Sequence, residues 1–125
     1  MKTLIYIKST ISLLKKNIIL ILLPFLVNSC NDIDFDSKKW RNWNYNENDW
    51  SMRWDMSEDL INNYELEGKD TNEIFNLLGK TELNCFKNEC YARYPLGPCR
   101  TGINEGTLEL TIKNGKVSEI SKRCN

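Results

Sequence analysis

The chain has 125 residues, with 17 Lys and Arg against 17 Asp and Glu and no histidine. Histidine is the side chain that most often carries protons in catalysis, so its absence argues against an enzyme. The formal net charge of the full chain is zero. The sequence contains no phosphate-binding loop, haem motif or calcium loop, so no cofactor is expected either.

The N-terminal segment has the pattern of a bacterial lipoprotein signal. A basic stretch without acidic residues precedes the apolar run 18–27, which is too short to span a membrane, and small residues then lead to Cys30. We expect removal of residues 1–29, a diacylglyceryl group on the Cys30 sulfur and acylation of its new amino group. Several acyl chains on one residue give stable membrane attachment. The alternative is an ordinary secretory peptide in which Cys30 is incidental.

Removal of this segment changes the charge of the chain. Residues 1–29 hold four lysines and no acid, so the mature chain carries 13 basic and 17 acidic residues, a net charge of −4. That sign argues against nucleic acid as a partner and is compatible with a soluble periplasmic or surface domain, which we expect the lipid anchor to hold at the outer membrane. Acidic residues close to the anchor resemble sorting signals for the outer surface, although a solvated spacer explains them equally well: Asp32, Asp34 and Asp36.

Residues 30–50 are interpreted as a lipid-anchored linker, because this stretch is rich in Asn, Asp and Lys and shows no apolar periodicity. Its aromatic residues form a dense cluster with the start of the next segment. Such side chains seldom stay fully solvated, so packing on the domain is the favoured interpretation; contact with the membrane interface or with a partner remains open. The cluster consists of Trp40, Trp43, Tyr45, Trp50 and Trp54.

Two helices are predicted at the start of the domain 51–125. The first begins between Ser51 and Met56 and ends near Gly68, with a capping box possible at Asp55 and Glu58. The second has its capping box at Asp70 and Glu73 and ends at Gly79. These helices carry little polar chemistry.

Strand periodicity follows Gly79. Alternation predicts strands at 90–96, 107–113 and 116–121, with a type I′ hairpin at Asn114-Gly115. A two-residue turn places Ile120 on the opposite face from Leu108, so a bulge or an amphipathic last strand is needed. Pro95 cannot donate a ladder hydrogen bond and should point away from a neighbouring strand or sit at an irregularity. The expected class is α+β, with two N-terminal helices packed on a three- to four-stranded antiparallel sheet.

Four cysteines follow the predicted linker, an even number in a chain expected to leave the reducing cytosol, and we predict disulfides. Zinc is the competing interpretation; the spacing lacks a paired knuckle and there is no histidine, so no metal is expected. The predicted strand order brings Cys124 to Cys99. Cys90 lies at the other end of its strand, so its partner should be Cys85, across a tight turn at 86–89.

The order of these elements resembles small bacterial lipoproteins with an SmpA/BamE-like domain. The similarity covers Arg53 to Ser121, and it implies two helices and a three-stranded antiparallel sheet, a fold that the β-lactamase inhibitor protein repeats in tandem. The chain departs from the pattern at Lys69, at Pro95 and in its four cysteines. The resemblance rests on the strings Arg53-x-x-Met56-x-x-Asp59-Leu60-Ile61, Leu66-x-Gly68, Glu73-Ile74-x-x-Leu77-Leu78-Gly79, Tyr94-x-Leu96-Gly97 and Gly106-x-Leu108-x-Leu110-x-Ile112-x-Asn114-Gly115-Lys116-Val117.

The resemblance implies an accessory role in the assembly of outer-membrane proteins through binding of other components, and none of the matched positions is a catalytic group. The first hypothesis is therefore an envelope binding module that docks through its sheet edge and the loop from Tyr94 to Gly106. The second is an inhibitor or immunity-type lipoprotein that blocks a secreted enzyme. A protein partner in the envelope and the membrane are expected, and the predicted partner-binding residues are Tyr94, Leu96, Gly97 and Pro98.

Overall fold

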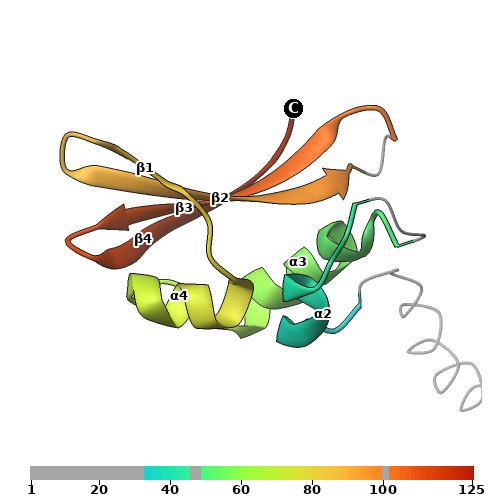
Figure 1. Cartoon of the computed structure of the whole chain (residues 1–125), viewed down its shortest axis with the longest axis horizontal. Helices are drawn as coiled ribbons and strands as arrows, with labels where there is room; N and C mark the ends of the chain where they lie inside the picture. Colours follow the sequence, from blue (N-terminus) through green and yellow to red (C-terminus); the bar gives the residue numbers. More distant parts are fainter. Residues whose placement is uncertain (1–32, 46–48, 100–101) are drawn as a thin grey trace, which may run out of the picture. The chain divides into compact units, whose positions relative to one another are not determined.

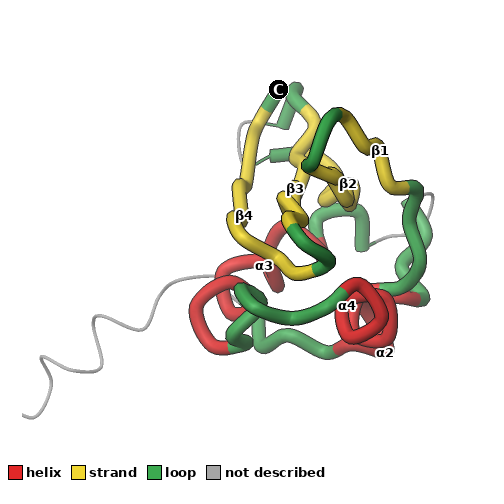
Figure 2. Tube along the Cα trace, turned by 90° about the vertical axis from the view of Figure 1, so that its left-hand side faces the viewer, coloured by secondary structure: helices red, strands yellow, loops and turns green. Residues whose placement is uncertain are grey.

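The computed structural model describes residues 33–45, 49–99 and 102–125. It is an α+β structure in which three described helices precede four strands, and the antiparallel sheet has the order β1-β2-β3-β4. The described helices lie against one face of the sheet, and none of them lies on the other face (Figures 1 and 2). The elements are α2 (Ser37–Arg41), α3 (Met52–Asn63), α4 (Thr71–Leu78), β1 (Leu83–Phe86), β2 (Glu89–Pro98), β3 (Glu105–Lys113) and β4 (Lys116–Cys124).

The core lies between the helices and the sheet. Alternate residues of β2 and β3 point toward the helices. Helical side chains spaced three or four residues apart pack against them. The α+β class and the antiparallel sheet are confirmed, and β1 supplies the fourth strand. The core side chains that are at most 1 % exposed are Trp40, Leu60, Leu66, Ile74, Leu78, Ala92, Leu96, Leu108 and Leu110.

Part of the predicted linker belongs to the domain. Trp40 is fully buried and Phe35 is 6 % exposed, and residues 33–45 belong to the same compact unit as the sheet. Asp36 caps α2 by accepting a hydrogen bond from the backbone N–H of Lys39 at 2.9 Å. The linker interpretation is therefore wrong for residues 33–45. A five-residue helix is too short for its apolar spacing to show as a period.

The two predicted helices are present, with one changed boundary. Asp70 and Glu73 form the predicted capping box of α4, which ends at Leu78 with Gly79 as its C-cap. Helix α3 begins after Ser51 and ends at Asn63, so Asp55 lies in its first turn and does not cap it. The residues that follow α3 extend toward the sheet, where the Gly68 N–H donates to the Val117 carbonyl at 2.8 Å.

The predicted irregularities of the sheet are confirmed. The register shifts between Thr111 and Ile112, so that Ile120 pairs with Leu110 and packs partly against the core. A second shift follows Pro95, which pairs with Thr107 immediately before it. The hairpin turn has φ of 52° at Asn114 and 76° at Gly115, as a type I′ turn requires.

Candidate functional site

Both predicted disulfides are present in the structure. Cys85 and Cys90 face each other across β1 and β2, with their Cα atoms 4.0 Å apart. Cys99 and Cys124 join the end of β2 to the end of β4, with Cα atoms 6.0 Å apart. The strand order used for the prediction therefore holds. Cys30, the predicted lipidation site, lies outside the described residues.

Three of the four predicted partner-binding residues are buried, and the fourth is half-buried. Leu96 is fully buried, Tyr94 is 3 % exposed, Gly97 is buried and Pro98 is half-buried. The Tyr94 hydroxyl donates to the Gly79 carbonyl at 2.8 Å, and burial raises the pKa of Tyr94 to about 12. Their place on the core side of β2 removes three of these residues from the accessible surface. The bulge after Pro95 contributes to this placement, since it turns both Leu96 and Gly97 inward.

Gly97 lies opposite Gly106, and residues of the aromatic cluster pack closely against these two glycines. A Cβ on Gly97 would stand 2.1 Å from the Trp50 carbonyl oxygen, and one on Gly106 would stand 2.5 Å from the Trp54 ring. The favoured interpretation of the aromatic cluster, packing on the domain, therefore holds for Trp40, Trp43 and Trp54. Trp50 is 57 % exposed and Tyr45 is 47 % exposed.

A buried arginine, Arg53, links α2 to β2. Arg53 is 9 % exposed; its Nε and Nη2 donate to the Trp40 carbonyl, and its Nη1 donates to the Pro95 carbonyl. Its guanidinium lies 5.0 Å from the Trp40 ring centroid and 4.8 Å from that of Trp43. Burial lowers the pKa of Arg53 to about 10, so it stays protonated at neutral pH. Its hydrogen bonds give it a structural role.

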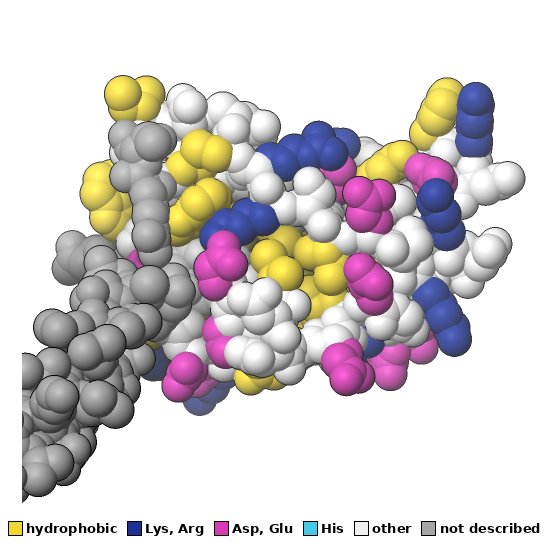
Figure 3. Space-filling model, turned by 180° about the vertical axis from the view of Figure 1, so that it is seen from behind, with side chains coloured by type: hydrophobic (Ala, Val, Ile, Leu, Met, Phe, Trp, Pro, Cys, Tyr) yellow, Lys and Arg dark blue, Asp and Glu magenta, His cyan; other side chains and the backbone are white. Residues whose placement is uncertain are grey.

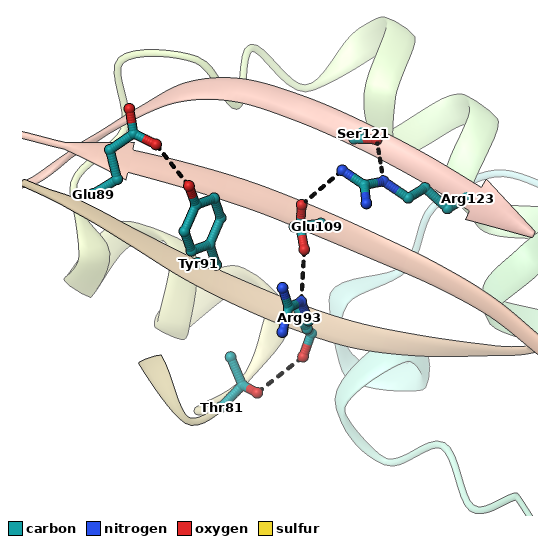
Figure 4. A network of polar contacts seen from close by, with 7 residues as sticks. All are labelled: Thr81, Glu89, Tyr91, Arg93, Glu109, Ser121 and Arg123. Atoms are coloured by element: carbon teal, nitrogen blue, oxygen red, sulfur yellow. Dashed lines mark hydrogen bonds and ion pairs between the residues drawn. The ribbon is translucent and has the colours of Figure 1, made fainter. Parts of the chain in front are cut away.

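The uncovered face of the sheet carries an ordered polar network, which Figure 4 shows from close by. The side chain of Glu109 is 8 % exposed and forms two ion pairs. One carboxylate oxygen lies 2.6 Å from Arg93 Nε, and the other lies 3.1 Å from Arg123 Nη2. The two arginine side chains are 53 % and 59 % exposed. Two guanidinium groups thus flank a single carboxylate, and this local group carries a net positive charge.

The network continues toward the β1–β2 turn. Glu89 accepts from Lys113 Nζ at 2.8 Å and from the Tyr91 hydroxyl at 2.6 Å. The ion pair with Lys113, followed by the bond from Tyr91, lowers the pKa of Glu89 below its ordinary value of 4.5. Phe86 pairs with Glu89 in the register and is 71 % exposed. We name the surface formed by Phe86, Glu89, Tyr91, Arg93, Glu109 and Arg123 the outer face.

The outer face was not predicted as a site. Its polar residues do show in the sequence as the solvent half of each strand alternation. Their assembly depends on which residues of β2, β3 and β4 lie side by side, and strand register is set by the whole sheet. Alternation within each strand therefore predicts which polar residues lie on this face, but it does not predict the contact of Arg93, Glu109 and Arg123.

A hollow of about 610 Å³ lies between residues 33–39 and residues 49–56. Its lining mixes apolar side chains such as Ile33 and Trp50 with four carboxylates and the lysine Lys39. Among the described residues, no group of three or more His, Cys, Asp or Glu side chains is placed to hold a metal ion.

Within residues 33–45, 49–99 and 102–125, none of the helices is long and apolar enough to cross a membrane. Comparisons of the chain with protein-family models, with curated proteins and with solved structures found no match.

Proposed function

We propose that the chain is a lipid-anchored binding module of the bacterial envelope. It is held at the outer membrane through Cys30 and docks on a protein of that envelope through the outer face. The role that follows is that of an accessory factor in the assembly of outer-membrane proteins or in envelope integrity. Two disulfides support the exported location, because such bonds persist in oxidising compartments.

The outer face is the observation that carries this proposal. Its exposed side chains include an aromatic ring at Phe86 and guanidinium groups at Arg93 and Arg123, residue types enriched at protein interfaces. The helices occupy the opposite face of the sheet (Figure 2), so this face is open to a partner. The matching partner is a protein with an apolar pocket for the Phe86 ring and a carboxylate opposite the arginines.

Binding fits this face better than turnover does. A general acid works best with a pKa near the operating pH, which in proteins requires the pKa of a carboxyl group to be raised. Lys113 and Tyr91 instead lower the pKa of Glu89, so this group is an ionised acceptor at neutral pH. Glu109 is engaged by two arginines at the same time. The carboxylates of the outer face thus position cations.

A second candidate function is inhibition of a secreted enzyme, and one observation favours it. Phe86 is 71 % exposed at a turn whose flanking residues are joined by the Cys85–Cys90 disulfide. A rigid tip loses little conformational entropy when it enters a cleft of another protein, which raises affinity. The two functions use the same outer face and differ in the identity of the partner.

The anchor is tested by replacement of its sulfur. Metabolic labelling with a fatty-acid analogue is expected to mark the wild type and not Cys30→Ser, because Cys30 is the cysteine at the end of the apolar leader. Membrane fractionation of both proteins provides the second readout. Label on Cys30→Ser, together with its retention in the membrane fraction, would refute the anchor.

The partner is tested by photo-crosslinking in intact envelopes. A photo-reactive amino acid at Glu119, which is exposed on β4 and pairs with Thr111 of β3 in the register, is expected to capture one protein. The same group at Asn62, exposed on α3, is the control for the helical side. Phe86→Ala should reduce the amount of captured protein at least about tenfold, since truncation of an anchoring aromatic side chain costs about 2 kcal/mol or more of binding free energy.

Ile103→Ala is the matched variant for this test, because Ile103 is also apolar and is 91 % exposed but lies off the outer face. It should retain the crosslink. A captured barrel-assembly component supports the accessory role, and a captured secreted enzyme supports inhibition. Equal capture from Asn62 and Glu119, or full capture by Phe86→Ala, would be inconsistent with docking through the outer face.

A further inference from the structure

The described domain begins very close to the proposed anchor. Ile33 is three residues after Cys30, so its Cα lies within about 11 Å of the anchor Cα even when the chain is fully extended. The backbone N–H of Ile33 donates to the Asp55 carbonyl at 3.3 Å, and that of Phe35 donates to the Asp59 carboxylate at 2.7 Å. These hydrogen bonds hold residues 33–35 against α3. A membrane that holds Cys30 therefore has to lie next to this part of the domain.

The surface at this point exposes apolar groups. Ile33 is 45 % exposed and Trp50 is 57 % exposed, and both line the 610 Å³ hollow. Figure 3 shows hydrophobic side chains gathered at the end of the domain away from the β1–β2 turn. Tryptophan is favoured at the membrane–water interface, where its ring meets the apolar layer while its N–H stays in a polar one. Ile33 and Trp50 thus suit an interfacial position.

The charges around these groups indicate which lipid is favoured. Among the described residues that line it, the hollow has the carboxylates of Asp34, Asp36, Asp49 and Asp55 and one ammonium group, that of Lys39. The backbone N–H of Lys39 holds the pKa of Asp36 below its ordinary value of 3.8, so this carboxylate is ionised at neutral pH. An anionic membrane surface would repel this group of acids, whereas the ammonium groups of a zwitterionic lipid would pair with them.

We infer that the surface of Ile33 and Trp50 lies in the interface of a membrane of zwitterionic, amine-bearing phospholipid. This inference rests on the proposed anchor at Cys30. The domain then stands directly on the membrane, and Trp50 adds apolar contact to the acyl chains of the anchor. A short tether and an exposed tryptophan at the same point give the domain a defined orientation, which an anchor on a long linker would not.

The experiment uses quenching of tryptophan fluorescence by lipid. The full chain, purified from envelopes with its anchor, is placed in vesicles of phosphatidylethanolamine and phosphatidylcholine whose phosphatidylcholine carries bromine near the headgroup. We expect the wild type to be quenched and Trp50→Phe to lose most of that quenching. The matched control is Trp54→Phe, which should keep it because Trp54 is half-buried against Gly106. Vesicles with a high share of phosphatidylglycerol should quench the wild type less.

Flotation of the same vesicles separates two kinds of failure. A protein that floats with the vesicles but shows equal quenching in the wild type and in Trp50→Phe overturns this inference and leaves the anchor intact. A protein that does not float overturns both the anchor and the inference. Near-ultraviolet circular dichroism of each variant shows whether the aromatic packing of the core is preserved.

Discussion

Replacement of Trp40 by alanine is expected to destabilise the domain by about 3–5 kcal/mol, the range for truncation of a large buried aromatic. Trp40 is fully buried, and its ring contacts Phe35 and Tyr94 edge-on, with centroids 5.7 and 6.5 Å away. The loss is large against a typical total stability of about 5–15 kcal/mol. Thermal unfolding followed by circular dichroism should show a Tm lower by at least about 12 °C.

Trp50→Ala is the matched control for this prediction. It removes the same type of side chain, but Trp50 is 57 % exposed, so the free energy of unfolding should change by no more than about 0.5 kcal/mol. A similar small effect of Trp40→Ala would show that residues 33–45 are a linker after all. The buried indole N–H of Trp40 has no hydrogen-bond partner among the described residues. Its removal in Trp40→Ala therefore offsets part of the loss of stability.

Gly97→Ala is expected to cost about 2–5 kcal/mol, through two separate causes. Gly97 has φ of 79°, a conformation in which an alanine is strained by roughly 1–2 kcal/mol. Its new Cβ would also stand 2.1 Å from the Trp50 carbonyl oxygen, so backbone has to move, and overpacking of this kind costs about 1–3 kcal/mol. Urea denaturation of the oxidised protein measures the loss as a lower midpoint at an unchanged slope.

Gly102→Ala separates the two causes. Gly102 has φ of 80°, but a Cβ there would meet nothing within 4 Å. It should therefore show the conformational strain alone, and the difference between the two variants gives the crowding by the Trp50 backbone. Gly106→Ala is the complementary change, since its Cβ would meet the Trp54 ring at 2.5 Å without a positive φ. Equal costs for Gly97→Ala and Gly102→Ala would contradict the close packing of the aromatic segment on the sheet.

Local signals account for what was predictable from the sequence. The capping box of α4, the Asn114-Gly115 turn and the alternation of β2 and β3 each depend on residues within a few positions of one another. The disulfide pairing followed once the strand order was known, because two strand ends at the same edge of a sheet leave few geometric choices.

Interactions between distant segments account for what was missed. Phe35 is held by Asp59, and the Trp40 carbonyl is held by Arg53, although neither Phe35 nor Trp40 belongs to a periodic pattern. Tyr94 and Leu96 were predicted to bind a partner, but both are buried, and the Tyr94 ring packs against Trp40 of α2. The salt-bridged trio on the outer face needed the register of three strands. Each of these cases depends on tertiary contacts that a single segment of sequence does not contain.

The Cys99–Cys124 bond also determines how the domain responds to proteolysis. Exposed residues 102–104, with Ile103 91 % exposed, form the part of the β2–β3 connection that suits a protease. A cut there falls inside the covalent ring from Cys99 to Cys124, so the fragment after the cut stays attached by the disulfide. It also keeps its place in the sheet through the β2–β3 ladder. The nicked domain therefore keeps its outer face, and the two pieces separate only after reduction and unfolding.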